Sequence, residues 1–221
     1  MNQMVRAKAT EMLAKVPNPV RLVVFTQENE CQHCKEAREV AQEVAGLSDR
    51  LSVEVYDLTK DSAKAAEYRV DKVPAICVAG AKDHGIRFYG VPAGYEFSTL
   101  VSLIDVVGRR DSGLRPESRA KLAGLASPVD LQVFVTLTCP ICPLAASVAA
   151  SLAIERDNIT LSIIDAAEFP RLAGLYNVMA VPRTVVNRGH SFEGALPEDR
   201  FIDEVLKGAD AKGKGESENG K

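Results

Sequence analysis

The 221-residue chain has no tryptophan, 5% aromatic residues and no apolar run near the ~18 residues that a membrane-spanning helix needs. Its start, MNQMVRAKATEMLAKV, alternates polar with apolar residues and has no continuous apolar core of the kind found in a signal peptide. Lys and Arg total 27 against 30 Asp and Glu, so a net charge of -3 creates no field that attracts polyanions. These absences predict a cytoplasmic protein without nucleic acid or membrane partners.

Cysteine is also scarce, and the few present are arranged in a pattern. The five cysteines form two C-x-x-C pairs, Cys31 with Cys34 and Cys139 with Cys142, and leave Cys77 single. A secreted mini-protein held together by disulfides would be shorter and richer in cysteine, so redox catalysis or metal binding is the better interpretation. The glycines form no G-x-G-x-x-G motif after a strand, so we expect no nicotinamide or flavin cofactor.

An internal repeat organises the chain. An offset of 108 residues superimposes both C-x-x-C pairs and also Asp57 on Asp165, Tyr68 on Tyr176 and Val73-Pro74 on Val181-Pro182. A repeat of this length is a small domain and not a solenoid unit. We therefore expect two similar domains at 1–107 and 117–207, a charged, glycine-containing linker at 108–116, and a disordered tail at 208–221.

Each unit follows one order of elements. An amphipathic helix (5–16; 117–125) is followed by a short β-branched strand (20–25; 129–135), the C-x-x-C helix (35–45; 144–153) and a second strand (51–56; 159–164). A shorter helix (62–68; 168–175) leads to a Val-Pro, a β-hairpin (75–79 with 86–89; 184–187 with 191–193) and a last helix. The strand–helix–strand segment requires a parallel pair with a right-handed crossover. The predicted fold class is α/β, with a mixed four-stranded sheet in each unit flanked by helices.

The C-x-x-C pairs are placed where thiol chemistry is favoured. Unpaired amides and the dipole at a helix N-terminus stabilise a thiolate, and we expect the first cysteine of each pair at the helix cap. The second cysteine then lies one turn inward on the same face. This spacing suits a reversible disulfide, in which Cys31 and Cys139 attack a substrate disulfide and Cys34 and Cys142 resolve the mixed disulfide.

The residues between the cysteines differ between the two sites. Pro140 suits a first helical position and would stiffen the CPIC turn. In CQHC, His33 is either an exposed residue of the first turn or a group that places a positive charge or a donor beside the Cys31 thiolate. The second interpretation would make the first site more oxidising.

Pro74 and Pro182 occupy matched positions, 43 residues after the first cysteine of each pair. Proline is acceptable at the first residue of a strand, but its repetition at this place favours a site role. We predict that both Val-Pro bonds are cis and that the backbones of Val73 and Val181 are exposed to pair with a substrate strand.

At this point the pattern resembles the thioredoxin fold, with glutaredoxins as the nearest relatives. Two tandem units carrying CQHC and TCPICPLA, followed by YNVMAVP, FYGVPAGYEF and FEGALPEDRF, resemble the glutaredoxin-like protein disulfide oxidoreductases. The resemblance implies one continuous sheet and an enzyme that reduces, forms or isomerises disulfides of protein substrates, with a thioredoxin reductase as electron donor. It also implies that Cys139 and Cys142 form the principal site. Phe25 and Phe134 stand where thioredoxins have a buried carboxylate, so proton transfer needs another group.

Three other functions remain open at this stage. Two C-x-x-C pairs can complete a structural zinc site, but 104 residues separate Cys34 from Cys139, and each pair opens its own helix, so no metal is expected. A non-catalytic adaptor would not need two complete pairs. An electron-relay module for a peroxiredoxin-type peroxidase is the main alternative, although such modules usually keep one pair.

Overall fold

The computed structural model describes residues 3–215, with side chains as far as residue 210. The chain order is α1 (Gln3–Leu13), β1 (Val20–Thr26), α2 (Cys34–Ala45), β2 (Leu51–Asp57), α3 (Ser62–Glu67), β3 (Ala75–Ala79), β4 (Asp83–Tyr89), α4 (Glu96–Arg109), α5 (Pro116–Ala123), β5 (Val129–Val135), α6 (Cys142–Glu155), β6 (Ile159–Asp165), α7 (Pro170–Leu175), β7 (Arg183–Val186), β8 (His190–Glu193) and α8 (Glu198–Gly215). The predicted order of elements is therefore confirmed in both units.

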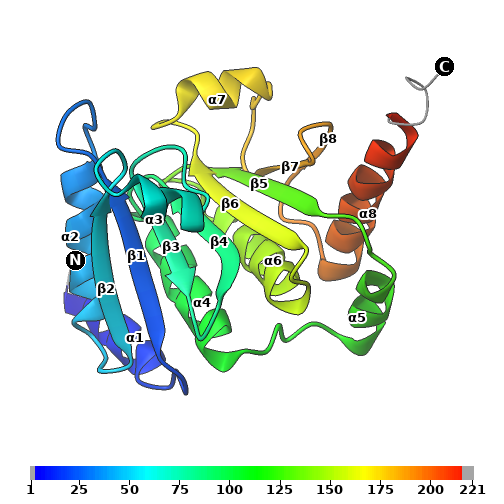
Figure 1. The fold of residues 1–221 in the computed structure, drawn as a ribbon. Coiled ribbons are helices and arrows are strands. Elements are labelled where there is room, and N and C mark those ends of the chain that lie inside the picture. The colour runs from blue at the N-terminus through cyan, green and yellow to red at the C-terminus, as the bar shows by residue number, and fades with distance from the viewer. Residues whose placement is uncertain (1–2, 216–221) are drawn as a thin grey trace.

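The eight strands form one mixed sheet in the order β2-β1-β3-β4-β6-β5-β7-β8 (Figure 1). Within each unit the first two strands are parallel and the hairpin is antiparallel. Strands β4 and β6 pair in parallel and join the two units. It follows that β1, β4, β6 and β5 all run in the same direction. The loops that follow β1 and β5 therefore leave the sheet at the same end, where these strands have their C-termini.

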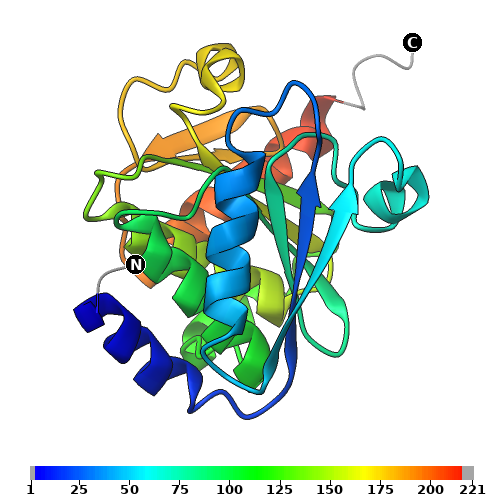
Figure 2. The same ribbon diagram turned by 90° about the vertical axis from the view of Figure 1, so that its left-hand side faces the viewer.

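Helices cover the two faces of this sheet unequally. Helices α1, α2, α4 and α6 lie on one face and α3 lies on the other, as the side view shows (Figure 2). The larger core lies under the first group and includes Leu22, Ile104 and Leu161, all fully buried. A smaller core on the opposite face packs α3 and α7 against Phe25 and Phe134. The two units therefore share one larger core that continues across their junction.

The connection between the units is shorter than the predicted linker. Helix α4 continues to Arg109, where Arg110 adopts a left-handed conformation, and α5 begins at Pro116. Gly108, expected in the linker, is a buried residue of α4 that lies against Val16 and Val20. Apolar packing at the end of α4 extends the helix past the glycine.

The predicted start of the tail at residue 208 is too early, because α8 runs on to Gly215. Gly208 lies directly on Val186 of β7, and Ala209 is 5% exposed. This contact with the sheet supports a helix in a segment whose composition suggested none. The rest of the predicted tail, 216–221, lies outside the described residues.

Within residues 3–215, no helix combines the length and the apolar character needed to cross a membrane.

Candidate active site

Both C-x-x-C pairs form disulfides at the same end of the sheet, where β1 and β5 have their C-termini. Cys31 is joined to Cys34 and Cys139 to Cys142, with Cα atoms 5.5 Å apart in each pair. Strands β1 and β5, which precede the pairs, are separated in the sheet by β3, β4 and β6. Four strand spacings of about 4.8 Å give roughly 19 Å between β1 and β5. The pairs are therefore two separate sites and not one four-sulfur cluster.

The cysteines lie at a different helix register from the predicted one. Helix α2 begins at Cys34 with His33 at its N-cap, and α6 begins at Cys142 with Ile141 at its N-cap. The first cysteine of each pair therefore precedes the cap instead of occupying it. Pro140, predicted at the first helical position, lies in the turn before α6 instead. Pro143, the second residue of α6, is the proline in the first helical turn. The helical hydrogen bonds start later because the segment from Cys139 to Ile141 forms a turn.

Backbone groups surround the sulfur of Cys139. The amide of Cys142 donates a hydrogen bond of 3.1 Å to Cys139 Sγ, and the carbonyl oxygen of Val181 lies 3.8 Å from the same sulfur. Cys139 is 7% exposed, whereas Cys142 is fully buried. Cys139 is therefore the more accessible of the two residues, and an amide already points at its sulfur where a thiolate would form.

The peptide bonds Val73–Pro74 and Val181–Pro182 are both cis, as predicted. The carbonyl of Pro74 accepts a hydrogen bond of 3.1 Å from Gly90, and that of Pro182 accepts one of 2.8 Å from Gly194. Each Val-Pro loop is thereby fixed to the end of its own hairpin.

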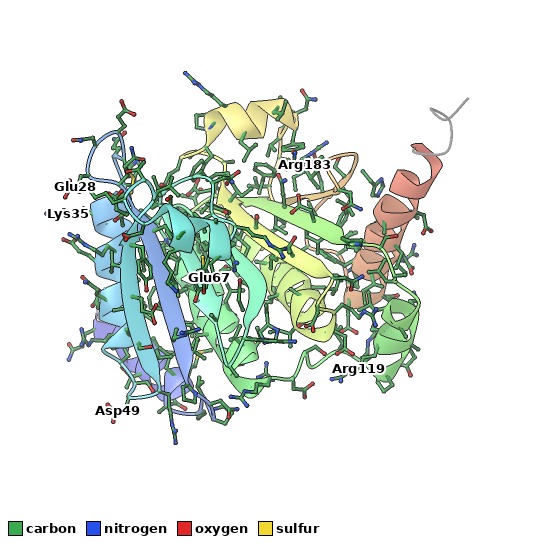
Figure 3. All side chains as sticks on the ribbon, in the orientation of Figure 1. Glu28, Lys35, Asp49, Glu67, Arg119 and Arg183 are labelled. Atoms are coloured by element: carbon green, nitrogen blue, oxygen red, sulfur yellow. A yellow bond between two sulfur atoms is a disulfide. The ribbon has the colours of Figure 1, made fainter. Side chains whose placement is uncertain are left out.

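The side chains around the two sites differ in character at equivalent positions of the repeat. Ile141, Leu144 and Met179 near the second pair are 44%, 60% and 89% exposed. At the first pair the equivalent residues are His33, Glu36 and Asp71. Figure 3 shows the charged Glu28 and Lys35 at the end of the sheet that carries the first pair. The second site is therefore bordered by apolar side chains and the first by charged ones.

His33 lies at the N-cap of α2, with Nδ1 4.0 Å from Oε2 of Glu36. Burial raises the pKa of two carboxylates of the second unit, Asp165 and Glu168, and His33 is among the groups that oppose this increase. His33 therefore has acidic neighbours from both units.

Two buried carboxylates between the sites, Glu96 and Asp165, and the partly buried carboxylate of Glu168 were missed in the sequence. Glu96 is fully buried, and neither of its carboxylate oxygens has a hydrogen-bond partner among the described residues. Burial raises its pKa to about 7. Burial also raises the pKa of Asp165 and of Glu168. One signal was available in the sequence. In the matched segments FYGVPAGYEF and FEGALPEDRF, the acidic Glu96 aligns with the basic Arg200, so the two units differ in charge at this repeat position.

The remaining candidates have no evident part in thiol exchange. Cys77 is free and fully buried in β3, and burial raises the pKa of its thiol to about 12. Glu54 lies on β2, where its carboxylate accepts a hydrogen bond from the hydroxyl of Tyr56. Within residues 3–215, no three His, Cys, Asp or Glu side chains are grouped so that they could hold a metal ion.

Comparison with known proteins agrees with this geometry. The thioredoxin domain family model matches residues 129–207. A protein disulfide oxidoreductase from Aeropyrum pernix K1 superimposes with a TM-score of 0.87 at 30% identity, covering 95% of this chain and 94% of that one. The NTD_N/C domain of alkylhydroperoxide reductase AhpF from Enterococcus faecalis has the same fold, with a TM-score of 0.87 at 23% identity over 93% of this chain and 99% of that one.

The curated relatives are longer proteins. A Bacillus subtilis protein named NADH dehydrogenase is 24% identical over 208 residues, which are 94% of this chain and 38% of that protein. The chain spans about a third of the length of the curated relatives that it matches. The fold, the two disulfide sites and the full-length likeness to the Aeropyrum protein together place this chain in the tandem thioredoxin-fold family of protein disulfide oxidoreductases.

Proposed function

We propose that the protein reduces, forms or isomerises disulfides of polypeptide substrates at Cys139–Cys142, and that Cys31–Cys34 exchanges electrons with a separate reductase. The observation that carries the proposal is that both disulfides lie at one end of a shared sheet, with an amide directed at Cys139 Sγ. The apolar border of Ile141, Leu144 and Met179 suits an unfolded polypeptide, because such chains expose apolar side chains. The charged border of the first pair suits a folded partner of complementary charge.

In the reducing direction, the Cys139 thiolate attacks one sulfur of the substrate disulfide. The substrate S–S bond breaks, a mixed disulfide forms, and the released substrate thiolate takes a proton. Cys142 then loses its proton and attacks Cys139, which releases the second substrate thiol and leaves Cys139–Cys142 oxidised. The reductase reduces Cys31–Cys34, and dithiol–disulfide exchange with Cys31–Cys34 restores the dithiol of Cys139–Cys142.

Glu96 is our candidate for accepting the proton of Cys142. It begins α4, directly after Tyr95, whose amide donates a 3.0 Å hydrogen bond to the carbonyl of Leu137 in the loop before Cys139. With a pKa near 7, its carboxyl can take up and release a proton near neutral pH. It would supply the group that Phe25 and Phe134 leave missing.

The test uses two variants that each keep one pair, Cys31→Ser/Cys34→Ser and Cys139→Ser/Cys142→Ser. With dithiothreitol as the reductant and insulin as the substrate, we expect the first variant to keep most of the activity and the second to lose at least tenfold. With a thioredoxin reductase and NADPH as the electron source, both variants should be slow. Equal activity of the two variants with dithiothreitol would contradict the assignment.

Likeness to the AhpF domain favours a second candidate, the transfer of electrons to a peroxidase. In that case the reduced protein would support peroxide turnover by a peroxiredoxin much faster than it reduces insulin. Ile141→Asp and Met179→Asp, which place charge on the apolar border, distinguish the two functions. We expect them to raise the KM for insulin severalfold and to leave the rate with dithiothreitol-sized disulfides unchanged.

A further inference from the structure

Asp165 and Glu168 lie between the two disulfide sites. Asp165 is the last residue of β6, paired with Val135 at the end of β5, and the neighbouring β4 ends one residue before Gly90. A Cβ atom at Gly90 would lie 2.9 Å from Cβ of Asp165. In the sheet order, β3 and β4 separate β6 from β1 on one side, and β5 is adjacent on the other. The carboxylates therefore lie at the end of the sheet that carries both disulfides, between Cys31–Cys34 and Cys139–Cys142.

Backbone hydrogen bonds connect this pair to the loops of both sites. Oε1 of Glu168 accepts a 2.8 Å hydrogen bond from the amide of Val91, which follows Gly90, and the Gly90 amide is bonded to Pro74 in the first site. On the other side, the amide of Ala166 donates a 2.9 Å hydrogen bond to Val135, at the start of the loop that carries Cys139. The pair is thus held against one loop of each site.

Both carboxylates keep one oxygen without a partner. Oδ1 of Asp165 accepts a 2.8 Å hydrogen bond from the amide of Ala167. The other oxygen of Asp165, Oδ2, and Oε2 of Glu168 are buried atoms without a hydrogen-bond partner among the described residues. Asp165 is 1% exposed. The ionisable groups that act on the pair are His33 and Glu36 from α2 and Glu96 from α4. A buried polar atom without a hydrogen-bond partner lowers the stability of the fold, so its presence calls for a functional explanation.

The repeat supplies an internal comparison. Asp57 is the equivalent of Asp165 in the first unit, but it ends β2, at the outer edge of the sheet. Oδ1 of Asp57 accepts hydrogen bonds from the amides of Thr59 and Lys60, and these bonds lower its pKa to about 2. The same residue type at the same repeat position is therefore partly exposed in the edge strand and buried at the junction of the units.

We infer that the Asp165–Glu168 pair couples the two disulfide sites electrostatically, so that a proton or a thiolate at one site changes the redox equilibrium of the other. This rests on the proposed function, since it requires both pairs to cycle. When a dithiol reduces either disulfide, the S–S bond breaks and two electrons and two protons are delivered. Where the attacking cysteine stays a thiolate, a carboxyl of this pair holds the second proton at low pH, and solvent takes that proton once the carboxyl is ionised. The linkage is reciprocal by thermodynamic necessity.

The test measures the equilibrium constant of each pair with dithiothreitol from pH 5.5 to 8.5, in the wild-type protein and in the two full-length single-pair variants described above, so that each pair is measured with the other pair able and unable to cycle. Each is compared with and without Asp165→Asn, which keeps an acceptor for Ala167 but removes the charge. Glu168→Gln is the second variant, and Asp57→Asn is the matched control at the equivalent position. Far-UV circular dichroism checks that each variant is folded.

We expect Asp165→Asn to favour the reduced form of both pairs at least fivefold, because a negative charge that lies between the two sites is removed. The shift should grow with pH as the carboxyl of the parent ionises, Glu168→Gln should act in the same direction, and Asp57→Asn should change neither pair more than twofold. A shift confined to one pair, no shift in either, or an equal shift in Asp57→Asn would overturn the coupling. If the parent variants do not cycle at all, the proposed function fails instead.

Discussion

The backbone amide of Cys142 donates a 3.1 Å hydrogen bond to the sulfur of Cys139. An amide at the start of α6 therefore points at the atom that carries the negative charge once the disulfide is reduced. Such a donor favours the thiolate over the thiol, which supports our proposal that Cys139 is the attacking cysteine of its pair. Cys142 itself is fully buried at the first position of α6, so a substrate cannot reach it directly.

This difference in access predicts which cysteine forms the mixed disulfide. In Cys142→Ser, attack by Cys139 should proceed but resolution should not, so that a covalent adduct with a disulfide-containing peptide accumulates. Mass spectrometry of the protein after reaction should show close to one peptide per chain. Cys139→Ser should yield less than a tenth of that adduct under the same conditions. Comparable adducts in both variants would show that burial does not separate the roles.

Cys77 should be unreactive while the protein is folded. Burial raises the pKa of its thiol to about 12, so almost none is thiolate at pH 8, and the side chain is fully enclosed. The oxidised protein should give less than 0.1 thiol per chain with Ellman's reagent in buffer and one in guanidinium chloride. Fast labelling in buffer would mean that β3 opens readily.

Glu96 should make stability depend on pH. Its pKa in the folded protein is raised to about 7 from an unfolded value of 4.5, so the folded state holds a proton that the unfolded state releases between these values. Stability should therefore decrease as pH rises from 5 to 8, by up to about 3 kcal/mol from this residue. Glu96→Gln should remove that loss, which urea unfolding at pH 5 and pH 8 would measure. An unchanged pH dependence in Glu96→Gln would contradict the burial of an ionisable group there.

Gly108 should not tolerate a side chain. A Cβ atom there would lie 2.2 Å from Cγ1 of Val16 and 3.2 Å from Cγ2 of Val20, within the larger core. Gly108→Ala should destabilise the protein by about 2 kcal/mol, although alanine favours helix over glycine by about 1 kcal/mol. Gly124→Ala is the control, because nothing lies within 4 Å of its Cβ position, and it should change stability by less than about 0.5 kcal/mol. Urea unfolding compares the two, and equal effects would refute the packing argument.

The repeat made much of the fold and of the site predictable. Hydrophobic periodicity placed the strands and helices, and the matched Val-Pro dipeptides placed both cis bonds, which are observed. The helix register failed for a local reason: the predicted position of Pro140 assumed that the helix begins at the first cysteine, whereas a turn intervenes and Pro143, the second residue of α6, lies in the first helical turn instead. A preference for the first turn does not say which of two nearby prolines occupies it.

The buried carboxylates could not be inferred from residue type. Asp57 and Asp165 are the same residue at the same repeat position, and only the pairing of β4 with β6 buries one of them. That pairing depends on how the two units associate, which the order of elements within one unit does not determine. Helix α8 illustrates the same limit, since its contact with Val186 extends a helix through a glycine-rich segment.

The central claim is that both pairs are redox sites of one oxidoreductase. The most direct measurement equilibrates the wild-type protein across glutathione and dithiothreitol redox buffers, alkylates the free thiols and locates them by mass spectrometry, with bound zinc measured in parallel. We predict reversible titration of Cys31–Cys34 and of Cys139–Cys142, with Cys31–Cys34 the more oxidising and with no zinc retained. Retained metal with neither pair cycling would contradict the account and would mean that the duplicated fold serves binding.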